Sequence, residues 1–509
     1  MLNRREFLRQ TAPFGLSAGL LPGFLTSIAA VAIAEERDRH KAPNILFVYT
    51  DDQRWDAMGV VQAEQGEKAR FPWLKTRNMD RLAQEGVRFR NAFVVNSICS
   101  PSRASFLTGQ YGHHNGVTDN VSHFPVENVT YASLLTEAGY ATGYFGKWHM
   151  GEQSGKRPRF TTSASYIGQG QYFDCPFEID GVVRPTKGWV DTVATDFAIE
   201  FIRKSRTRPF LAVVGFKAVH EKRQPRPEDR GLYEGVQVGV PGNRYVLPPF
   251  KESFSRSASE KLKSPDDKQH PINDYDRQYF QTLSGADHNL GRLLHAIDEL
   301  GLRENTLVVF TSDNGYFMGE HDLGDKRYAY EESLRIPLLL RYPKLTTPTK
   351  IADQMVLNID FAPTVLDLAG IPIPSSIQGK SWKPLLTESN PKWRRQFYYE
   401  YHTDRQFPAV PRVQALRTET AKFIVYPGHD WVELYDLDKD PLETRNLAKD
   451  PEAAALLGMM TQRFLEEQQW VSTTPRRQSH RTMHPFTEKE KHHEKPTPVC
   501  FSVRRTRAH

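Results

Sequence analysis

Asn44-Ile45-Leu46-Phe47-Val48-Tyr49-Thr50-Asp51-Asp52 joins a continuous apolar run to a pair of carboxylates. Such a run is typical of a strand buried on both faces of a mostly parallel sheet. Ligands of open α/β sheets bind at the carboxyl ends of their strands. We therefore expect an α/β fold, a large mostly parallel sheet between helices, with polar residues gathered at one edge. Three more apolar runs end in this way: residues 142–146 before Lys147 and His149, 210–215 before Lys217 and His220, and 307–310 before Asp313 and Asn314.

The pattern of predicted elements changes near residue 380. Before it, helical periodicity alternates with the apolar strands, and a glycine follows each helix, over residues 78–85, 131–138 and 275–300. After it, short strand-like runs separated by turns span residues 396–401, 413–417, 422–426 and 433–435, and a helix spans 451–469. We expect a catalytic domain over 41–380 and a C-terminal subdomain with a small antiparallel sheet over 381–470. Residues 221–273 predict a long surface excursion beside the site.

A second informative run is Cys99-Ser100-Pro101-Ser102-Arg103-Ala104. Pro101 suits the first turn of a helix, and Gly109 suits the left-handed residue that ends one. Residue 99 is thus predicted at a helix N-terminus, where free N–H groups and the helix dipole favour an anion. Arg103, one turn later, adds a positive charge at the same point. The alternative is an inert buried cysteine.

The polar residues at the strand ends suit the chemistry of an anionic ester. Hydrolysis of such an ester needs a nucleophile, positive charge around the anionic oxygens and an acid for the leaving group. There are ordinary alternatives: the Asp pairs could form turns or cap helices, and the Lys and His residues could lie on the surface. The candidates are Asp51, Asp52, Asp313 and Asn314 as hard ligands for Ca²⁺ or Mg²⁺, Arg103, Lys147 and Lys326 as cations, and His149 and His220 as proton carriers.

Several blocks of the chain resemble the type I, formylglycine-dependent sulfatases of the alkaline phosphatase superfamily. The Cys-x-Pro-Ser-Arg block at Cys99 is highly specific to that family. The resemblance implies an alkaline phosphatase-like fold and hydrolysis of sulfate esters. The other blocks are residues 44–52, Gly146-Lys147-Trp148-His149-Met150-Gly151, residues 312–315 with 319–326, and residues 433–447.

The resemblance also implies a role for each matched residue. Cys99 is expected to become formylglycine through a formylglycine-generating or sulfatase-maturating enzyme, and to join the metal ligands Asp51, Asp52, Asp313 and Asn314. The remaining roles are Arg103 and Lys147 as stabilisers of the formylglycine hydrate with help from His149, and His220 and Lys326 as contacts to the sulfate that aid departure of the leaving group. One departure is visible, because Lys222 stands where many relatives have a proline two residues after this histidine.

Residues 168–174 and 112–115 resemble segments of sulfatases that act on N-acetylglucosamine 6-sulfate and related glycosaminoglycan units. A sulfated sugar or glycosaminoglycan is therefore the expected substrate, with His114, Lys217 and His321 as substrate-binding residues. A sulfated algal polysaccharide or an aryl sulfate stays open. Two other functions also stay open: a phosphodiesterase or phosphonate monoester hydrolase of the same superfamily, and an inactive carbohydrate-binding homologue.

Residues 1–34 resemble an export signal. Arg4 and Arg5 precede an apolar stretch that ends in Ala32-Ile33-Ala34, a cleavage-site pattern. A membrane anchor is the alternative, but glycine and proline residues interrupt the stretch, so we expect no stable membrane insertion. Export by the twin-arginine machinery would make the protein periplasmic or secreted.

The charge of the chain is concentrated near its end. The formal net charge is +6, and residues 473–509 hold nine Lys or Arg against three Glu, so the rest is near neutral. This segment has no apolar periodicity, and we expect a basic disordered tail, with binding of an acidic polymer as an open alternative. No nucleic-acid-binding motif is present, which argues against nucleic acid as a partner. Three cysteines are too few for a disulfide scaffold.

Overall fold

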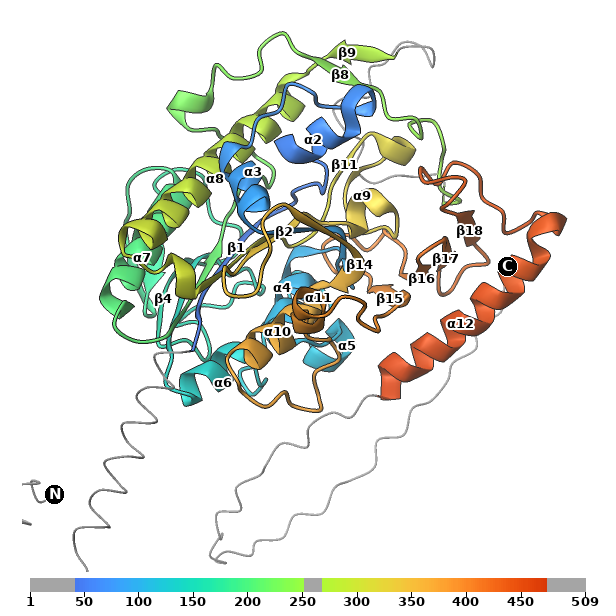
Figure 1. Ribbon diagram of the computed structural model, residues 1–509. Coiled ribbons are helices and arrows are strands. Elements are labelled where there is room, and N and C mark those ends of the chain that lie inside the picture. Colours follow the sequence, from blue (N-terminus) through green and yellow to red (C-terminus); the bar gives the residue numbers. More distant parts are fainter. Residues whose placement is uncertain (1–41, 251–267, 474–509) are drawn as a thin grey trace, which may run out of the picture. The chain divides into compact units, whose positions relative to one another are not determined.

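The structure, a computed structural model, describes residues 42–250 and 268–473 (Figure 1). The predicted export signal and all but the first residue of the predicted tail lie outside the described residues. So does the middle of the predicted excursion, residues 251–267. In the part of the chain that is described, no helix is both long enough and apolar enough to cross a membrane.

The centre of the molecule is a ten-stranded sheet, and it is mixed rather than mostly parallel. The strand order is β14 (Lys350–Leu357), β2 (Val87–Phe93), β13 (Leu338–Arg341), β10 (Thr306–Ser312), β1 (Asn44–Thr50), β7 (Phe210–Gly215), β3 (Ala141–Lys147), β4 (Thr162–Tyr166), β5 (Phe177–Ile179) and β6 (Val182–Arg184). Strands β10, β1, β7, β3 and β4 form a parallel block. Strand β13 runs antiparallel to β10 and β2, and β5 and β6 continue antiparallel from β4. The predicted α/β class is confirmed.

Helices cover both faces of this sheet. Residues 45–48 of strand β1 are apolar because they face the hydrophobic cores on both sides. Leu46 and Val48 enter one hydrophobic core, whereas Ile45 and Phe47 enter another, since successive side chains of a strand point to opposite faces. Three helices, α3 (Arg77–Glu85), α7 (Val190–Ser205) and α8 (Asp274–Glu299), contribute to the first core. The second core contains α4 (Cys99–Thr108), α6 (Tyr131–Glu137) and α10 (Phe361–Leu368) (Figure 1).

The C-terminal part forms a separate antiparallel sheet. Its strands, in order, are β15 (Gln396–Tyr401), β16 (Val413–Thr418), β17 (Ala421–Val425) and β18 (Val432–Asp436), and helix α12 (Ala454–Thr473) packs on the first three. A third hydrophobic core joins this sheet to the large one, because Phe93 and Ile98 pack with Phe397 and Phe423. The shorter elements are α2 (Gly59–Gln65), α5 (Gly112–Asn115), α9 (Glu331–Leu334), α11 (Lys383–Thr387), β8 (Gln237–Gly239), β9 (Gln269–Pro271), β11 (Phe317–Met318) and β12 (Gly324–Asp325).

Candidate active site

Two neighbouring strands bring four predicted oxygen ligands together. β1 and β10 run parallel with their last residues opposite each other, so Asp51 and Asp52 leave the sheet beside Asp313 and Asn314. The backbone N–H of Asp52 donates to Asp313 Oδ1 at 3.1 Å. All four side chains are buried. Parallel pairing therefore places Asp52 against Asn314, which is 262 positions away in the sequence.

This set of oxygens fits a hard divalent cation. One oxygen from each of Asp51, Asp52 and Asp313 lies within 4.8 Å of the others. Asn314 donates its Nδ2 to Asp52 Oδ1 at 2.7 Å, whereas its buried Oδ1 has no hydrogen-bond partner among the described residues. Buried polar atoms without a partner are rare in folded proteins and point to a missing ligand. Three carboxylates and an amide oxygen form a donor set that suits Ca²⁺ or Mg²⁺.

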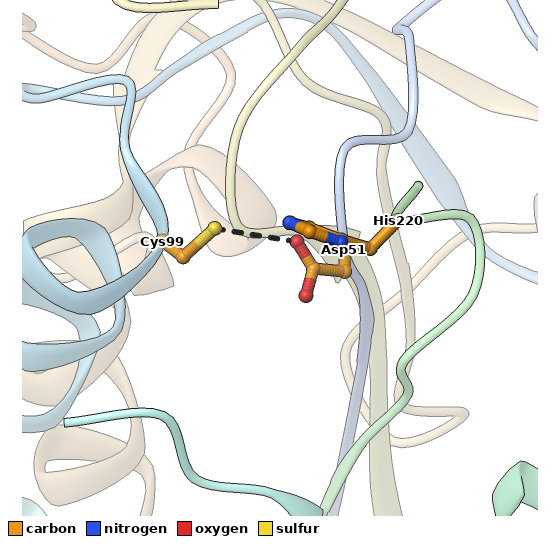
Figure 2. A group of neighbouring side chains, drawn as sticks. All are labelled: Asp51, Cys99 and His220. Carbon is orange, nitrogen blue, oxygen red and sulfur yellow. Dashed lines mark hydrogen bonds between the residues drawn. The ribbon is translucent and has the colours of Figure 1, made fainter. Parts of the chain in front are cut away.

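Cys99 begins helix α4 and faces these carboxylates. The helix ends at Gly109, whose φ of 68° gives the predicted left-handed cap. The Sγ atom of Cys99 lies 3.4 Å from Asp51 Oδ1 and 3.4 Å from Lys326 Nζ. Figure 2 shows Cys99 and His220 on two sides of the Asp51 carboxylate. The positive dipole end of the helix thus lies at the carboxylates, while the N–H groups of Ser100 and Ser102 donate to Asn120 Oδ1 and to the carbonyl oxygen of Ile98.

The unmodified thiol of Cys99 is a poor nucleophile. Burial and the Asp51 carboxylate raise the pKa of Cys99 to about 12, although Lys326 and Lys147 act in the opposite direction. Because the thiolate is the reactive form, a thiol with this pKa has almost no nucleophilic fraction near neutral pH. The unmodified thiol is therefore protonated near neutral pH.

Arg103 is held rigidly beside Cys99. Its Nε donates to Asp313 Oδ2 at 2.8 Å, and a terminal nitrogen donates to Asp51 Oδ2 at 3.2 Å. The guanidinium also lies 4.8 Å above the ring of Tyr49. A buried arginine with these contacts provides a positive charge that cannot be deprotonated and does not move.

Two lysines complete the charge balance. Lys147, at the end of β3, forms an ion pair with Asp51, and Lys326 forms one with Asp52. Although burial alone would raise it, Lys147 and the other nearby cations hold the pKa of Asp51 well below its usual range. Arg103 and these two lysines balance the three carboxylates, so a bound divalent cation would leave an excess of positive charge, which favours an anionic group. We call Asp51, Asp52, Cys99, Arg103, Lys147, Asp313, Asn314 and Lys326 the strand-end cluster.

Both predicted histidines adjoin this cluster. The Nε2 atom of His220 lies 4.0 Å from Asp52 Oδ2. The ring of His149 is buried, and its Nδ1 has no hydrogen-bond partner among the described residues. Burial, followed by the charge of Lys147, lowers the pKa of both imidazoles well below 6.5, so both are neutral at neutral pH. A neutral imidazole can accept a proton at a ring nitrogen.

Gln169 is a contact that the sequence analysis did not single out. Its side-chain oxygen accepts a hydrogen bond from Lys147, and its carbonyl oxygen accepts one from Lys217 Nζ at 3.0 Å. Gln169 therefore brings Lys217 to the strand-end cluster. The only signal in the sequence is the pair of flanking glycines, Gly168 and Gly170, whose φ values of 57° and 60° let the loop turn at this point.

The structure does not bring His114 and His321 to the strand-end cluster. His114 Nε2 lies 2.7 Å from the carbonyl oxygen of Val471 on helix α12. His321 stacks on Tyr330, with ring centroids 4.0 Å apart, and its Nε2 is 3.1 Å from Asn243 Nδ2. Both rings take part in packing against other segments. Substrate binding by these two histidines therefore stays a prediction, and neither ring has a contact to the strand-end cluster among the hydrogen bonds described above.

Comparison with known proteins agrees with this site. The sulfatase family model matches residues 43–371, and the model for the C-terminal region of N-sulphoglucosamine sulphohydrolase matches 319–470. An N-acetylglucosamine-6-O-sulfatase of Bacteroides thetaiotaomicron is 32% identical over 88% of this chain and 90% of its own length. The human N-acetylglucosamine-6-sulfatase is 27% identical over 84% of each chain.

Solved structures give the same result. A sulfatase-like structure described as a complex with D-glucosamine-2-N,6-O-disulfate superposes with a TM-score of 0.75 and 32% identity, over 86% of this chain and 99% of the other. A phosphonate monoester hydrolase from Silicibacter pomeroyi has a TM-score of 0.68 at 22% identity, over 86% of this chain and 96% of the other, and shares the fold alone. The chain therefore belongs to the sulfatase family of the alkaline phosphatase superfamily and is a sulfuric ester hydrolase.

Proposed function

We propose that this sulfatase removes 6-O-sulfate from glucosamine units of a sulfated sugar or glycosaminoglycan. A formylglycine at position 99 and a divalent cation, Ca²⁺ or else Mg²⁺, serve the reaction. The observation that carries the proposal is the position of Cys99, at a helix N-terminus between Asp51 and Lys326. The substrate class is supported by the names of relatives that match most of the chain.

The divalent cation and the formylglycine each have a defined position in this proposal. Asp51, Asp52, Asp313 and Asn314 would hold the cation, which supplies polarisation of the sulfate oxygens when bound. The hydrated formylglycine at position 99 supplies the attacking hydroxyl. The high pKa of the unmodified Cys99 thiol supports the modification, since the thiol itself would be protonated and unreactive.

The remaining residues of the cluster bind and orient the anionic group. Arg103 and Lys147 place positive charge next to position 99, and the bonds of Arg103 to two carboxylates keep that charge in place. His149 assists them from the end of β3. Lys326 Nζ lies 3.4 Å from Cys99 Sγ and His220 Nε2 lies 4.0 Å from Asp52 Oδ2, and in this proposal both residues contact the sulfate and help the leaving oxygen depart. Lys217 is the substrate-binding residue that the proposal retains.

Mass spectrometry of the tryptic peptide that spans residues 91–103 tests the nucleophile. We expect an aldehyde or its hydrate at position 99 in protein made by a host with the maturating enzyme, and release of sulfate from glucosamine 6-sulfate by that protein. Cys99→Ala should lose at least about a thousandfold in turnover while remaining folded. An unmodified cysteine together with an inactive protein would favour the carbohydrate-binding alternative. Cleavage of an aryl phosphodiester in preference to an aryl sulfate would favour the phosphodiesterase alternative.

Maturation and export are part of the same proposal. A formylglycine-generating or sulfatase-maturating enzyme would modify Cys99 before the folded chain leaves the cytoplasm through the twin-arginine machinery. The support is the arginine pair and the Ala32-Ile33-Ala34 pattern. Replacement of Arg4 and Arg5 by lysine is expected to leave the protein in the cytoplasm, and unchanged export of that variant would contradict this route.

A further inference from the structure

Asp191 is a buried carboxylate that none of the assigned roles uses. It lies in the first turn of helix α7 and is fully shielded from solvent. Its Oδ1 accepts the backbone N–H of Lys217 at 2.7 Å, and its Oδ2 accepts that of Ala218 at 3.0 Å. Hydrogen bonds to an ionised acceptor are stronger than those between neutral groups. Both carboxylate oxygens of Asp191 accept such bonds from the loop of residues 217–220.

The loop held by Asp191 joins two parts of the active site. Ala218 accepts the backbone N–H of Asp51 at 2.8 Å, and Val219 donates its N–H to the carbonyl oxygen of Asp51 at 2.8 Å. The same loop carries Lys217 and His220, the two residues assigned to the substrate side of the site. Tyr172 supports its far end by donating its hydroxyl to the carbonyl oxygen of His220 at 2.7 Å. The positions of the Lys217 and His220 side chains thus depend on hydrogen bonds made by the backbone of this loop, in addition to side-chain packing.

We propose that Asp191 is a positioning residue, which holds the Lys217–His220 loop so that both side chains meet the sulfate ester. The inference rests on the proposed function, because that function assigns the two side chains to the substrate. Without the Asp191 carboxylate, two buried N–H groups would lose their acceptors and the loop would shift to find others. A displacement of about 1 Å in a catalytic side chain can cost about a hundredfold in rate.

Asp287 provides a matched control for a purely structural effect. Its carboxylate also accepts two successive backbone N–H groups, those of Asn78 at 3.1 Å and Met79 at 2.8 Å. It is likewise buried, and it links helix α8 to the start of α3 rather than to the Lys217–His220 loop. Asp191→Asn and Asp287→Asn therefore remove the same kind of interaction, with only the first at the active site.

The experiment compares both variants in the full chain with the wild type. Both should have a lower Tm, but only Asp191→Asn should lower kcat, by about 10- to 100-fold per molecule of formylglycine-containing enzyme. In a background that lacks both positioned side chains, Lys217→Ala together with His220→Ala, the effect of Asp191→Asn on kcat should shrink to less than about threefold. If Asp191→Asn does not fold, Asp191→Ser replaces it in the comparison, because serine keeps one acceptor oxygen in a smaller side chain.

Two outcomes would overturn the inference. One is equal kcat in Asp191→Asn and Asp287→Asn. The other is a loss from Asp191→Asn that stays undiminished when Lys217 and His220 are both replaced by alanine. A wild-type enzyme that releases no sulfate from glucosamine 6-sulfate but is active on another sulfated sugar would overturn the proposed substrate alone. The Asp191 comparison would then be made on that other sugar.

Discussion

Within residues 42–250 and 268–473, two buried regions have ligand atoms close enough to hold a cation, and the carboxylates Asp51 and Glu332 in them differ in protonation state. The first is the strand-end cluster, in which fixed cations keep Asp51 ionised. The second, the His321 cluster, consists of His321, Glu332 and Glu443, which come from separate segments of the C-terminal half. Burial, together with neighbouring carboxylates, raises the pKa of Glu332 to about 8. Glu332 therefore carries a proton at neutral pH.

The surroundings of the His321 cluster explain this difference. Asn243 Nδ2 lies 3.1 Å from His321 Nε2 and 3.0 Å from Glu332 Oε1. Lys422 Nζ lies 2.7 Å from Glu443 Oε1. Donors of the protein thus reach one oxygen of each glutamate, Glu332 Oε2 has no hydrogen-bond partner among the described residues, and protonation removes the charge of Glu332. Short distances between ligand atoms do not define a metal site, because the charges and donors around them decide whether a cation is required.

Removal of divalent metal should separate the two clusters most strongly. Treatment with EDTA is expected to lower sulfate release at least about a hundredfold, because the sulfate oxygens lose their polarising cation. It should also lower Tm, since a metal that binds only the native state stabilises it. Added Ca²⁺ should restore both, in the wild type and equally in Glu332→Gln. Activity that resists complete chelation would contradict a metal site in the strand-end cluster.

One buried lysine, Lys326, belongs to the strand-end cluster, and another, Lys422, contacts the His321 cluster through Glu443; the two should respond differently to alanine. Lys326→Ala is expected to lower turnover by about a hundredfold or more while the protein stays folded, because the proposed function places Lys326 against the sulfate. Lys422→Ala should instead lower Tm, since it removes the lysine beside Glu443 and one of two cations beside Glu331, with turnover per folded molecule nearly unchanged. Kinetics and thermal unfolding of both variants check the pair. Near-wild-type turnover of Lys326→Ala would remove its assigned role.

The smallest expected effect is a pH dependence of stability in the His321 cluster. Glu332 has a folded-state pKa of about 8, above the ordinary glutamate value of 4.5, so the native state binds the proton more tightly than the unfolded state. Its contribution to stability is therefore complete below about pH 4.5 and is lost as pH rises toward 8. Glu332→Gln should flatten the decline of Tm between pH 5 and 8 by about a few degrees. An unchanged slope would show that Glu332 does not hold the proton.

The central strands could be predicted from the sequence, whereas the flanking ones could not. The central residues of strands β1, β7 and β10 are apolar because both faces of these strands are covered. Strand β2 escaped prediction because Arg88, Arg90 and Asn91 interrupt its apolar residues. Arg88 and Arg90 pair with Glu64, a contact from outside the strand. The polar residues of β2 therefore masked its strand pattern in the sequence, because their ion-pair partner, Glu64, lies outside the strand.

The same distinction applies to the active site. The sequence by itself determined the family, through the Cys99 block, and it predicted which oxygens could hold a metal, because these residues follow buried strands. Only the tertiary structure showed that Gln169 and Asp191 contact residues of this site and that the rings of His114 and His321 pack against other segments. A sequence pattern reports the neighbours of a residue along the chain. Residues that are far apart in sequence meet only when parallel strands pair, and that pairing decides which side chains share one site.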